Sequence, residues 1–126
     1  MSIGLALGRI AASAIMLAAA ATNVGAAGAL AIGSCDRHGY AYDYATVDQA
    51  RTRALVECAS EGDRSCHVVS ETAGGCAAFA ISGNCGPRGW SSASSRTEAE
   101  GLALDYCRRY GGAHCRVRRW VCDGGN

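Results

Sequence analysis

Eight cysteines are the most chemically reactive side chains in this sequence of 126 residues. Successive cysteines lie 23, 8, 10, 9, 22, 8 and 7 residues apart. A structural zinc site usually draws on closely spaced cysteine pairs, and a redox-active thiol often belongs to a C-x-x-C motif. Neither pattern occurs, so we expect no metal site and no thiol catalysis. An even number of cysteines at this density predicts a disulfide framework in an exported protein.

The N-terminal segment has the features of a secretory signal peptide. Arg9 precedes an apolar run over residues 10–21, and Val24 and Ala26 suit cleavage after Ala26. We therefore predict a signal peptide over residues 1–26 and a secreted or periplasmic protein. The alternative is a membrane anchor formed by the uncleaved segment, although twelve helical residues reach only about 18 Å across a hydrocarbon core of roughly 30 Å. After cleavage we expect no stable membrane span.

Composition and charge exclude several classes of protein. Apolar residues make up 49% of the chain and charged residues 18%, which argues against intrinsic disorder. Cleavage after Ala26 would remove Arg9 and no acid, leaving 11 basic and 11 acidic residues in 100. A neutral chain of that size predicts one small domain and no nucleic-acid partner bound through a net basic field.

Catalytic constellations are scarce. The three histidines, His38, His67 and His114, do not recur at equivalent places in the internal repeat described below. The chain has no G-x-S-x-G, no H-E-x-x-H and no phosphate-binding glycine loop, so we expect neither an enzyme nor a cofactor. Asp43 and Glu71 could form a carboxylate pair, so a small secreted hydrolase with an unrecognised site stays an alternative.

Aromatic and arginine side chains indicate a binding surface. Three tyrosines alternate along the expected strand 40–44, and alternate residues of a regular strand share a face. Along the expected strand 115–121, Arg116, Arg118 and Trp120 should likewise share one face. Tyrosine, tryptophan and arginine are enriched at interface hot spots. The predicted surface consists of Tyr40, Tyr42, Tyr44, Trp90, Arg116, Arg118 and Trp120. The alternative is that the tyrosines complete a thin core and the arginines are solvated.

An internal repeat organises these residues. Residues 29–76 align with residues 78–122 at an offset of 49–50. The strongest match sets Ala54-Leu55-x-x-Cys58 against Ala103-Leu104-x-x-Cys107, and Tyr40 falls opposite Trp90. We therefore predict one duplicated domain over residues 29–125.

Each copy reads as strand, strand, helix, strand. Thr46-x-x-Gln49 and Ser95-x-x-Glu98 are capping boxes at equivalent places, and glycines follow each expected helix. The expected strands cover residues 29–33, 40–44, 66–71, 78–82, 90–94 and 115–122. The predicted fold class is α+β, with two ββαβ repeats. We expect them to form an antiparallel or mixed sheet of about six strands, with two helices on one face and disulfide staples.

Repeat symmetry suggests a disulfide pairing among the 105 that eight cysteines allow. Two bridges would join a helix end to the next strand, and two would join equivalent cysteines of the two copies. The expected local pairs are Cys58–Cys66 and Cys107–Cys115. The expected pairs between copies are Cys35–Cys85 and Cys76–Cys122.

Charge is divided between the copies. Residues 29–77 hold 4 arginines and 7 acids, for a net charge of −3, and residues 78–126 hold 7 arginines and 4 acids, for +3. Either the halves attract each other or the second half presents a basic patch to an anionic partner.

The order of these motifs resembles a known family. GYAYDYATVDQARTRALVEC, CHVVSETAGGCAAFAIS, RGWSSASSRTEAEGLALDYC and HCRVRRWVC are similar to segments of the bacterial exported domain of unknown function 4189. The resemblance covers roughly residues 29–125. It implies export and disulfides but supplies no activity and no catalytic residue. Cys35 and Cys85 look like additions to the usual six-cysteine pattern of that family.

These observations favour an exported, disulfide-rich binding module whose partner is a protein or an envelope component. An inhibitor-type protein is one form that such a module can take. A small secreted hydrolase and a structural envelope protein are the alternatives.

Overall fold

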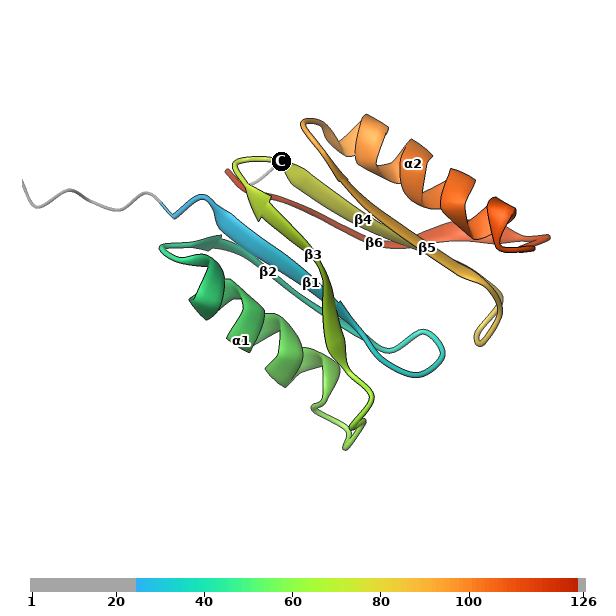
Figure 1. The fold of residues 1–126 in the computed structure, drawn as a ribbon, viewed down its shortest axis with the longest axis horizontal. Coiled ribbons are helices and arrows are strands. Elements are labelled where there is room, and N and C mark those ends of the chain that lie inside the picture. The colour runs from blue at the N-terminus through green and yellow to red at the C-terminus, as the bar shows by residue number, and fades with distance from the viewer. Residues whose placement is uncertain (1–24, 125–126) are drawn as a thin grey trace, which may run out of the picture.

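A computed structural model describes residues 25–124, and the predicted signal peptide lies almost wholly outside this range. The elements follow the order strand, strand, helix, strand twice (Figure 1). The first unit contains β1 (Ala27–Ile32), β2 (His38–Tyr44), α1 (Val47–Cys58) and β3 (His67–Ala73). The second contains β4 (Cys76–Ser82), β5 (Arg88–Ala93), α2 (Arg96–Arg109) and β6 (Cys115–Cys122).

Both helices begin at the predicted caps. The Thr46 hydroxyl accepts a hydrogen bond from the backbone N–H of Gln49, and the Ser95 hydroxyl accepts one from the N–H of Glu98, each at 3.2 Å. These bonds satisfy N–H groups that have no partner inside the helix. The predicted N-caps Thr46 and Ser95 are therefore confirmed in both copies.

The six strands form two antiparallel sheets of three strands each, with the orders β2-β1-β3 and β5-β4-β6. The α+β class and the repeated unit are confirmed. The expected single sheet with both helices on one face is corrected, because the two sheets pack face to face and α1 and α2 cover opposite outer sides (Figure 1).

The central strands explain this layered arrangement. In β1, Ala29 and Ala31 pack toward α1, whereas Leu30 and Ile32 pack toward the second sheet. β4 repeats the pattern, with alanines toward α2 and larger side chains, including Phe79, toward the first sheet. One sheet with both helices on the same face would leave the larger side chains in water, at a cost of about 1.5–3 kcal/mol each.

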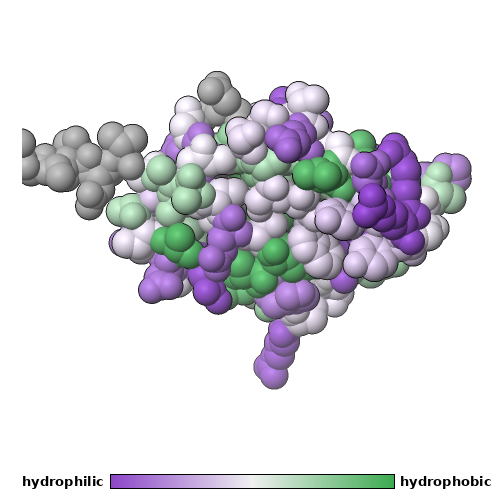
Figure 2. Space-filling model, turned by 45° about the horizontal axis from the view of Figure 1, so that its top comes forward, coloured by the Kyte–Doolittle hydropathy of each residue, from purple (hydrophilic) through white to green (hydrophobic). Residues whose placement is uncertain are grey.

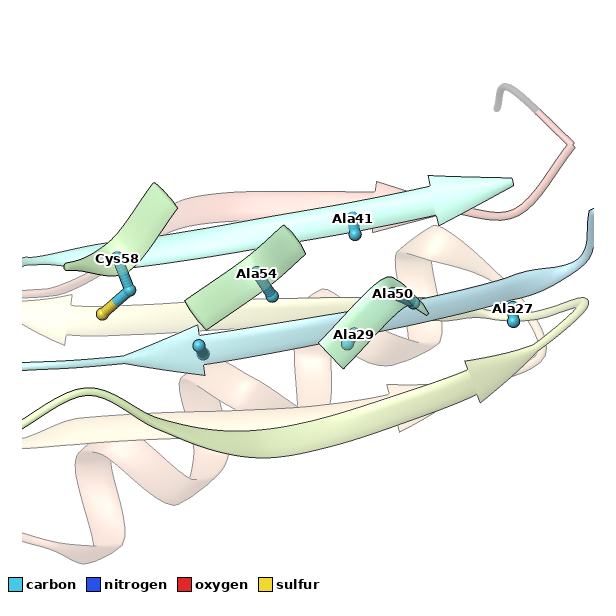
Figure 3. Close-up of a cluster of buried hydrophobic side chains, with 7 residues drawn as sticks. Ala27, Ala29, Ala41, Ala50, Ala54 and Cys58 are labelled. Atoms are coloured by element: carbon cyan, nitrogen blue, oxygen red, sulfur yellow. The ribbon is translucent and has the colours of Figure 1, made fainter. Parts of the chain in front are cut away.

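Small side chains line each contact between a helix and its sheet. Ala50 and Ala54 of α1 lie against Ala29 of β1 and Ala41 of β2, and all four side chains are at most 3% exposed (Figure 3). Alanine has little rotamer freedom to lose on burial. The close approach of helix and sheet therefore depends on the absence of larger side chains at these positions.

Strand register defines which residues of the two units are equivalent. β3 and β6 each contain an extra residue at the same place, opposite the Leu30/Ala31 step of β1 and the Phe79/Ala80 step of β4. The extra residues are Val69 and Arg118, so these two positions correspond. The following residues correspond in turn, which sets Ser70-Glu71 against Arg119-Trp120.

The four disulfides are Cys35–Cys85, Cys58–Cys66, Cys76–Cys122 and Cys107–Cys115, so the predicted pairing is confirmed. The pair Cys76–Cys122 is correct, but the expectation that it joins the two copies is wrong. Cys76 is the first residue of β4 and lies directly opposite Cys122 in β6, so this bridge staples one sheet of the second unit. Its equivalents in the first unit are Ala27 and Ala73. Of the four disulfides, Cys35–Cys85 alone joins the two units.

Within residues 25–124, neither helix combines the length and the apolar character that crossing a bilayer requires.

Candidate functional site

A groove of about 550 Å³ lies along β6, between the start of α2 and the exposed side of β2. It is lined by Tyr40, Tyr42, Arg96, Glu100, Val117, Arg118, Arg119, Trp120, Val121 and Cys122. The face of the molecule in Figure 2 carries small, separate hydrophobic patches among hydrophilic side chains. The lining of the groove itself combines aromatic rings, arginines and a glutamate, which favours recognition through mixed polar and aromatic groups.

The groove follows the edge of a strand rather than its face. Side chains on one face of a strand alternate, so a groove across a face would be lined by every second residue. Six successive residues of β6, from Val117 to Cys122, line this groove. β6 is the edge strand in the order β5-β4-β6. The backbone edge of β6 therefore runs along the groove.

One wall of the groove is formed by Arg96, which stacks on Trp120. Trp120 lies opposite Ala78 in the sheet and faces α2, and the Arg96 guanidinium sits 3.7 Å from the centre of its ring. Arg96 also donates from Nε to the Glu100 carboxylate at 2.7 Å, one helical turn later. The stacking and the ion pair together hold the Arg96 side chain against the ring.

The opposite wall comes from the first unit. The rings of Tyr40 and Tyr42 are stacked with centres 6.3 Å apart and planes 4° from parallel. The Arg119 guanidinium from β6 lies 4.6 Å from the centre of the Tyr40 ring. Two arginine–aromatic pairs therefore flank the strand edge.

His38 anchors Arg119 beneath this wall. The Nε of Arg119 donates to Nε2 of His38 at 3.2 Å, and Nδ1 of His38 lies 2.7 Å from the carbonyl oxygen of Asp36. This geometry requires a neutral ring with the proton on Nδ1, because Nε2 must accept. Burial lowers the pKa of His38, and the positive charges of Arg118 and Arg119 lower it further.

Arg118 completes the set of groove arginines. Its Nε donates to the Asp36 carboxylate at 3.3 Å, and both side chains are about one-third exposed. This ion pair joins the acidic first unit to the basic second unit. Arg88 adds a hydrogen bond to the carbonyl oxygen of Gly33 across the same junction. These contacts agree with the first charge expectation, that the two halves attract each other.

The structure brings together four of the seven residues of the predicted surface, namely Tyr40, Tyr42, Arg118 and Trp120. Tyr44 lies on the opposite face and packs against the core under α1. The reason is a bulge in β2, where Asp43 adopts a left-handed φ of 59° and one extra residue reverses the alternation. The expectation that all three tyrosines share a face is therefore wrong.

A second bulge corrects the prediction for β6. Arg116 pairs with Ile81, on the side of β4 that faces the first sheet, whereas Trp120 pairs with Ala78, on the side that faces α2. The extra residue at Arg118 separates them, so Arg116, Arg118 and Trp120 do not form one regular face. Arg116 is exposed and does not line the groove.

Trp90 belongs to another part of the molecule. It lies on β5 and lines a hollow of about 310 Å³ with Val69 of β3, Tyr106 of α2 and Tyr110, the residue that follows α2. The contacts between β3 and β5 are the symmetry equivalent of those between β6 and β2. Trp90 therefore lies at the hollow equivalent to the groove, on the other side of the pseudo-twofold axis. We call the borders of the groove and of this hollow the two rims.

The prediction missed Arg96, Glu100 and Arg119. Arg96 and Glu100 look like an ordinary exposed ion pair on a helix, and Arg119 was expected on the opposite face of its strand. A comparison of equivalent repeat positions points to Arg119 and its neighbours, because the segment 118–120 reads Arg-Arg-Trp where residues 69–71 read Val-Ser-Glu.

A family model described as Domain of unknown function (DUF4189) matches residues 27–122. Among solved structures, the NMR structure of Rv1813c from Mycobacterium tuberculosis is similar, with a TM-score of 0.51 and 22% sequence identity. The match covers 75% of this chain and 75% of that chain. At this identity the likeness shows a related fold. No curated protein matches the sequence.

Proposed function

Because the chain belongs to the DUF4189 family, whose description states no activity, we propose a function from its own geometry. The protein is an exported, non-catalytic binding module that recognises a protein or an envelope component through the groove along β6.

The observation that carries this proposal is the contrast between two equivalent rims of one molecule. Around the groove, β6 supplies Arg118, Arg119 and Trp120. The same scaffold positions in the first unit hold Val69, Ser70 and Glu71. Tyr42 likewise corresponds to Ser92, and Arg96 to Val47. The fold therefore forms without arginines and aromatic rings at these positions. Aromatic rings line both the groove and its equivalent hollow, but Arg96, Arg118 and Arg119 line the groove alone of the two, and arginines placed beside aromatic rings favour a role in recognition.

The contacts of the reactive side chains support a role without catalysis. All eight cysteines are in disulfides, so none of these thiols serves as a nucleophile. Both ring nitrogens of His38 have partners inside the fold, the carbonyl of Asp36 and the guanidinium of Arg119. A general base needs a free ring nitrogen within reach of a substrate proton, which these contacts disfavour for His38.

The disulfides support export. Four disulfides in so small a domain are typical of an oxidising compartment outside the cytosol. The predicted cleavage after Ala26 falls directly before β1, which begins at Ala27. Cleavage there would leave every strand complete.

The test exchanges groove residues for their equivalents in the other unit. In the double variant Arg119→Ser and Trp120→Glu, the new side chains match Ser70 and Glu71, which hold the equivalent positions of β3. The matched control is Arg116→His, which copies His67 at an exposed position outside the groove.

Each oxidised protein, immobilised and exposed to envelope extract, is compared by quantitative mass spectrometry of the retained components. We expect one component to be retained by the wild type and by the control, and to fall at least about tenfold on the double variant. Equal retention by all three proteins, or none by the wild type, would overturn the proposal. Thermal denaturation of the three proteins shows that each is folded.

A further inference from the structure

We propose that the groove binds an extended, acidic peptide segment, which pairs with the backbone edge of β6 as an added strand. This inference rests on the proposed function and names the chemistry of the partner.

The floor of the groove matches a peptide backbone. Within residues 25–124, β6 pairs with β4 and with no other strand. An edge strand presents a row of N–H and C=O groups that lack strand partners, and an extended peptide satisfies such a row by strand addition. Because six successive residues of β6 line the groove, a peptide lying in it would run alongside this row.

The arginines of the groove match carboxylates. Arg96, Arg118 and Arg119 each donate from Nε to a group of the protein, namely Glu100, Asp36 and His38. These bonds orient each guanidinium and leave the two Nη groups without a hydrogen bond among the described residues. Two parallel N–H donors fit the two oxygens of a carboxylate.

The charge balance of the groove favours an acidic ligand. Arg96 and Arg118 are paired with Glu100 and Asp36, so these four charges cancel. Arg119 is held by a neutral histidine, and its positive charge is therefore not cancelled by its partner. A carboxylate near Arg119 would meet a pre-oriented cation that needs little further ordering.

The aromatic wall gives the ligand side chains a surface. Tyr42 is 46% exposed, and its ring continues the stack of Arg119 on Tyr40 along the groove. Side chains of an added strand alternate between its two faces. One set could therefore lie toward Arg119 and the tyrosines while the other lies toward Arg96 and Trp120. A nucleic acid could use the arginines and the aromatic rings but would leave the backbone row of β6 unpaired, so a peptide fits more of the groove.

The experiment measures binding of the oxidised protein to a fluorescein-labelled synthetic peptide that alternates glutamate with valine. Two matched peptides separate the contributions. In the first, glutamine replaces every glutamate, and in the second, alternate backbone amides are N-methylated so that they cannot donate hydrogen bonds. We expect each change to weaken binding at least about tenfold. Hydrogen exchange should slow for backbone amides within residues 117–122 when the parent peptide binds.

Protein variants locate the site. Arg119→Ser should weaken binding of the parent peptide at least about fivefold, and the exposed control Arg116→His should leave the affinity within about twofold.

The inference is overturned if the glutamine peptide binds equally well, if N-methylation has no effect, or if single-stranded oligothymidine displaces the peptide at equal concentration. Absence of peptide binding, together with groove-dependent capture of an envelope component, would reject the acidic strand and leave the proposed function standing. Loss of groove-dependent capture would reject the proposed function itself.

Discussion

Arg119 of β6 donates a hydrogen bond from Nε to Nε2 of His38 in β2, at 3.2 Å, and so ties the second unit to the first. The bond exists only while His38 is neutral, because a protonated imidazole has no acceptor. Protonation would also place a third positive charge beside Arg118 and Arg119. The junction between the units is therefore sensitive to acid through this one histidine.

The first prediction concerns pH. The pKa of His38 is below 6.5 in the folded protein because burial disfavours the charged ring. As the pH falls below about 6.5, the unfolded chain binds a proton before the folded one, so the free energy of unfolding decreases until the pH passes the folded pKa. Above about 6.5 both states are neutral and the contribution is constant.

The test compares the wild type with His38→Gln by urea denaturation between about pH 7.5 and about pH 5. The unfolding free energy of the wild type minus that of His38→Gln should decrease as the pH falls. If this value stays constant or increases as the pH falls, His38 does not confer the sensitivity to acid.

The second prediction concerns Gly39, where β2 passes under α1. A Cβ at this position would overlap the carbonyl oxygen of Ala54, and Gly89 meets Ala103 of α2 in the same way. Because backbone atoms in a packed helix cannot move aside cheaply, Gly39→Ala should lower the unfolding free energy by at least about 2 kcal/mol.

Gly101 is the control, because a Cβ fits there and the substitution should raise stability instead of lowering it. It lies inside α2, and a Cβ added there would meet no heavy atom within 4 Å beyond its own stretch of helix backbone. Gly101→Ala should therefore raise stability by about 1 kcal/mol through helix propensity. Chemical denaturation measures both effects. Equal stability of Gly39→Ala and Gly101→Ala would contradict the packing of helix on strand.

The third prediction concerns Cys35–Cys85, the bridge between the units. Both cysteines are exposed, so their replacement by alanine leaves the core intact. The bridge spans 50 residues of sequence, and its removal should lower the unfolding free energy by about 4 kcal/mol through the entropy of the unfolded chain. Guanidinium denaturation without reductant measures the loss, with Asn84→Ala in the same loop as the control. A double variant as stable as the wild type would refute this role.

The fourth prediction concerns Asp123, which follows β6 and clamps the first unit. Its carboxylate accepts hydrogen bonds from the Thr72 hydroxyl at 2.6 Å, the Gly74 N–H at 3.0 Å and the Asp43 N–H at 3.2 Å. Asp123→Ala would leave the buried Thr72 hydroxyl without this acceptor, so we expect a loss of about 1–3 kcal/mol. Asp105→Ala, in an exposed pair on α2, should change stability by less than about 1 kcal/mol. Thermal denaturation compares them, and equal melting temperatures for both variants and the wild type would disprove the clamp.

Local and repeated features could be predicted from the sequence. Thr46 and Ser95 cap their helices through atoms only three residues away, so the pattern itself contains the interaction. Cys58–Cys66 and Cys107–Cys115 are separated by eight residues and occur twice, which made their pairing recognisable. The duplication similarly indicated the strand, strand, helix, strand order of both units.

The candidate groove depended on features that no local pattern contains. Alternation along a strand predicts faces only while the strand is regular, and bulges at Asp43 and Arg118 separated Tyr44 and Arg116 from the other residues of the expected surface. A bulge is a property of the pairing between two strands, so its position depends on a partner distant in the sequence. The sequence by itself determined the capped helices, the duplicated unit and the two cysteine pairs that join a helix end to the next strand, because these rest on contacts between near neighbours or on repetition. The tertiary structure alone decided that two sheets pack face to face and that β6 meets β2, because those contacts join side chains about 80 residues apart, as Arg119 and His38 show.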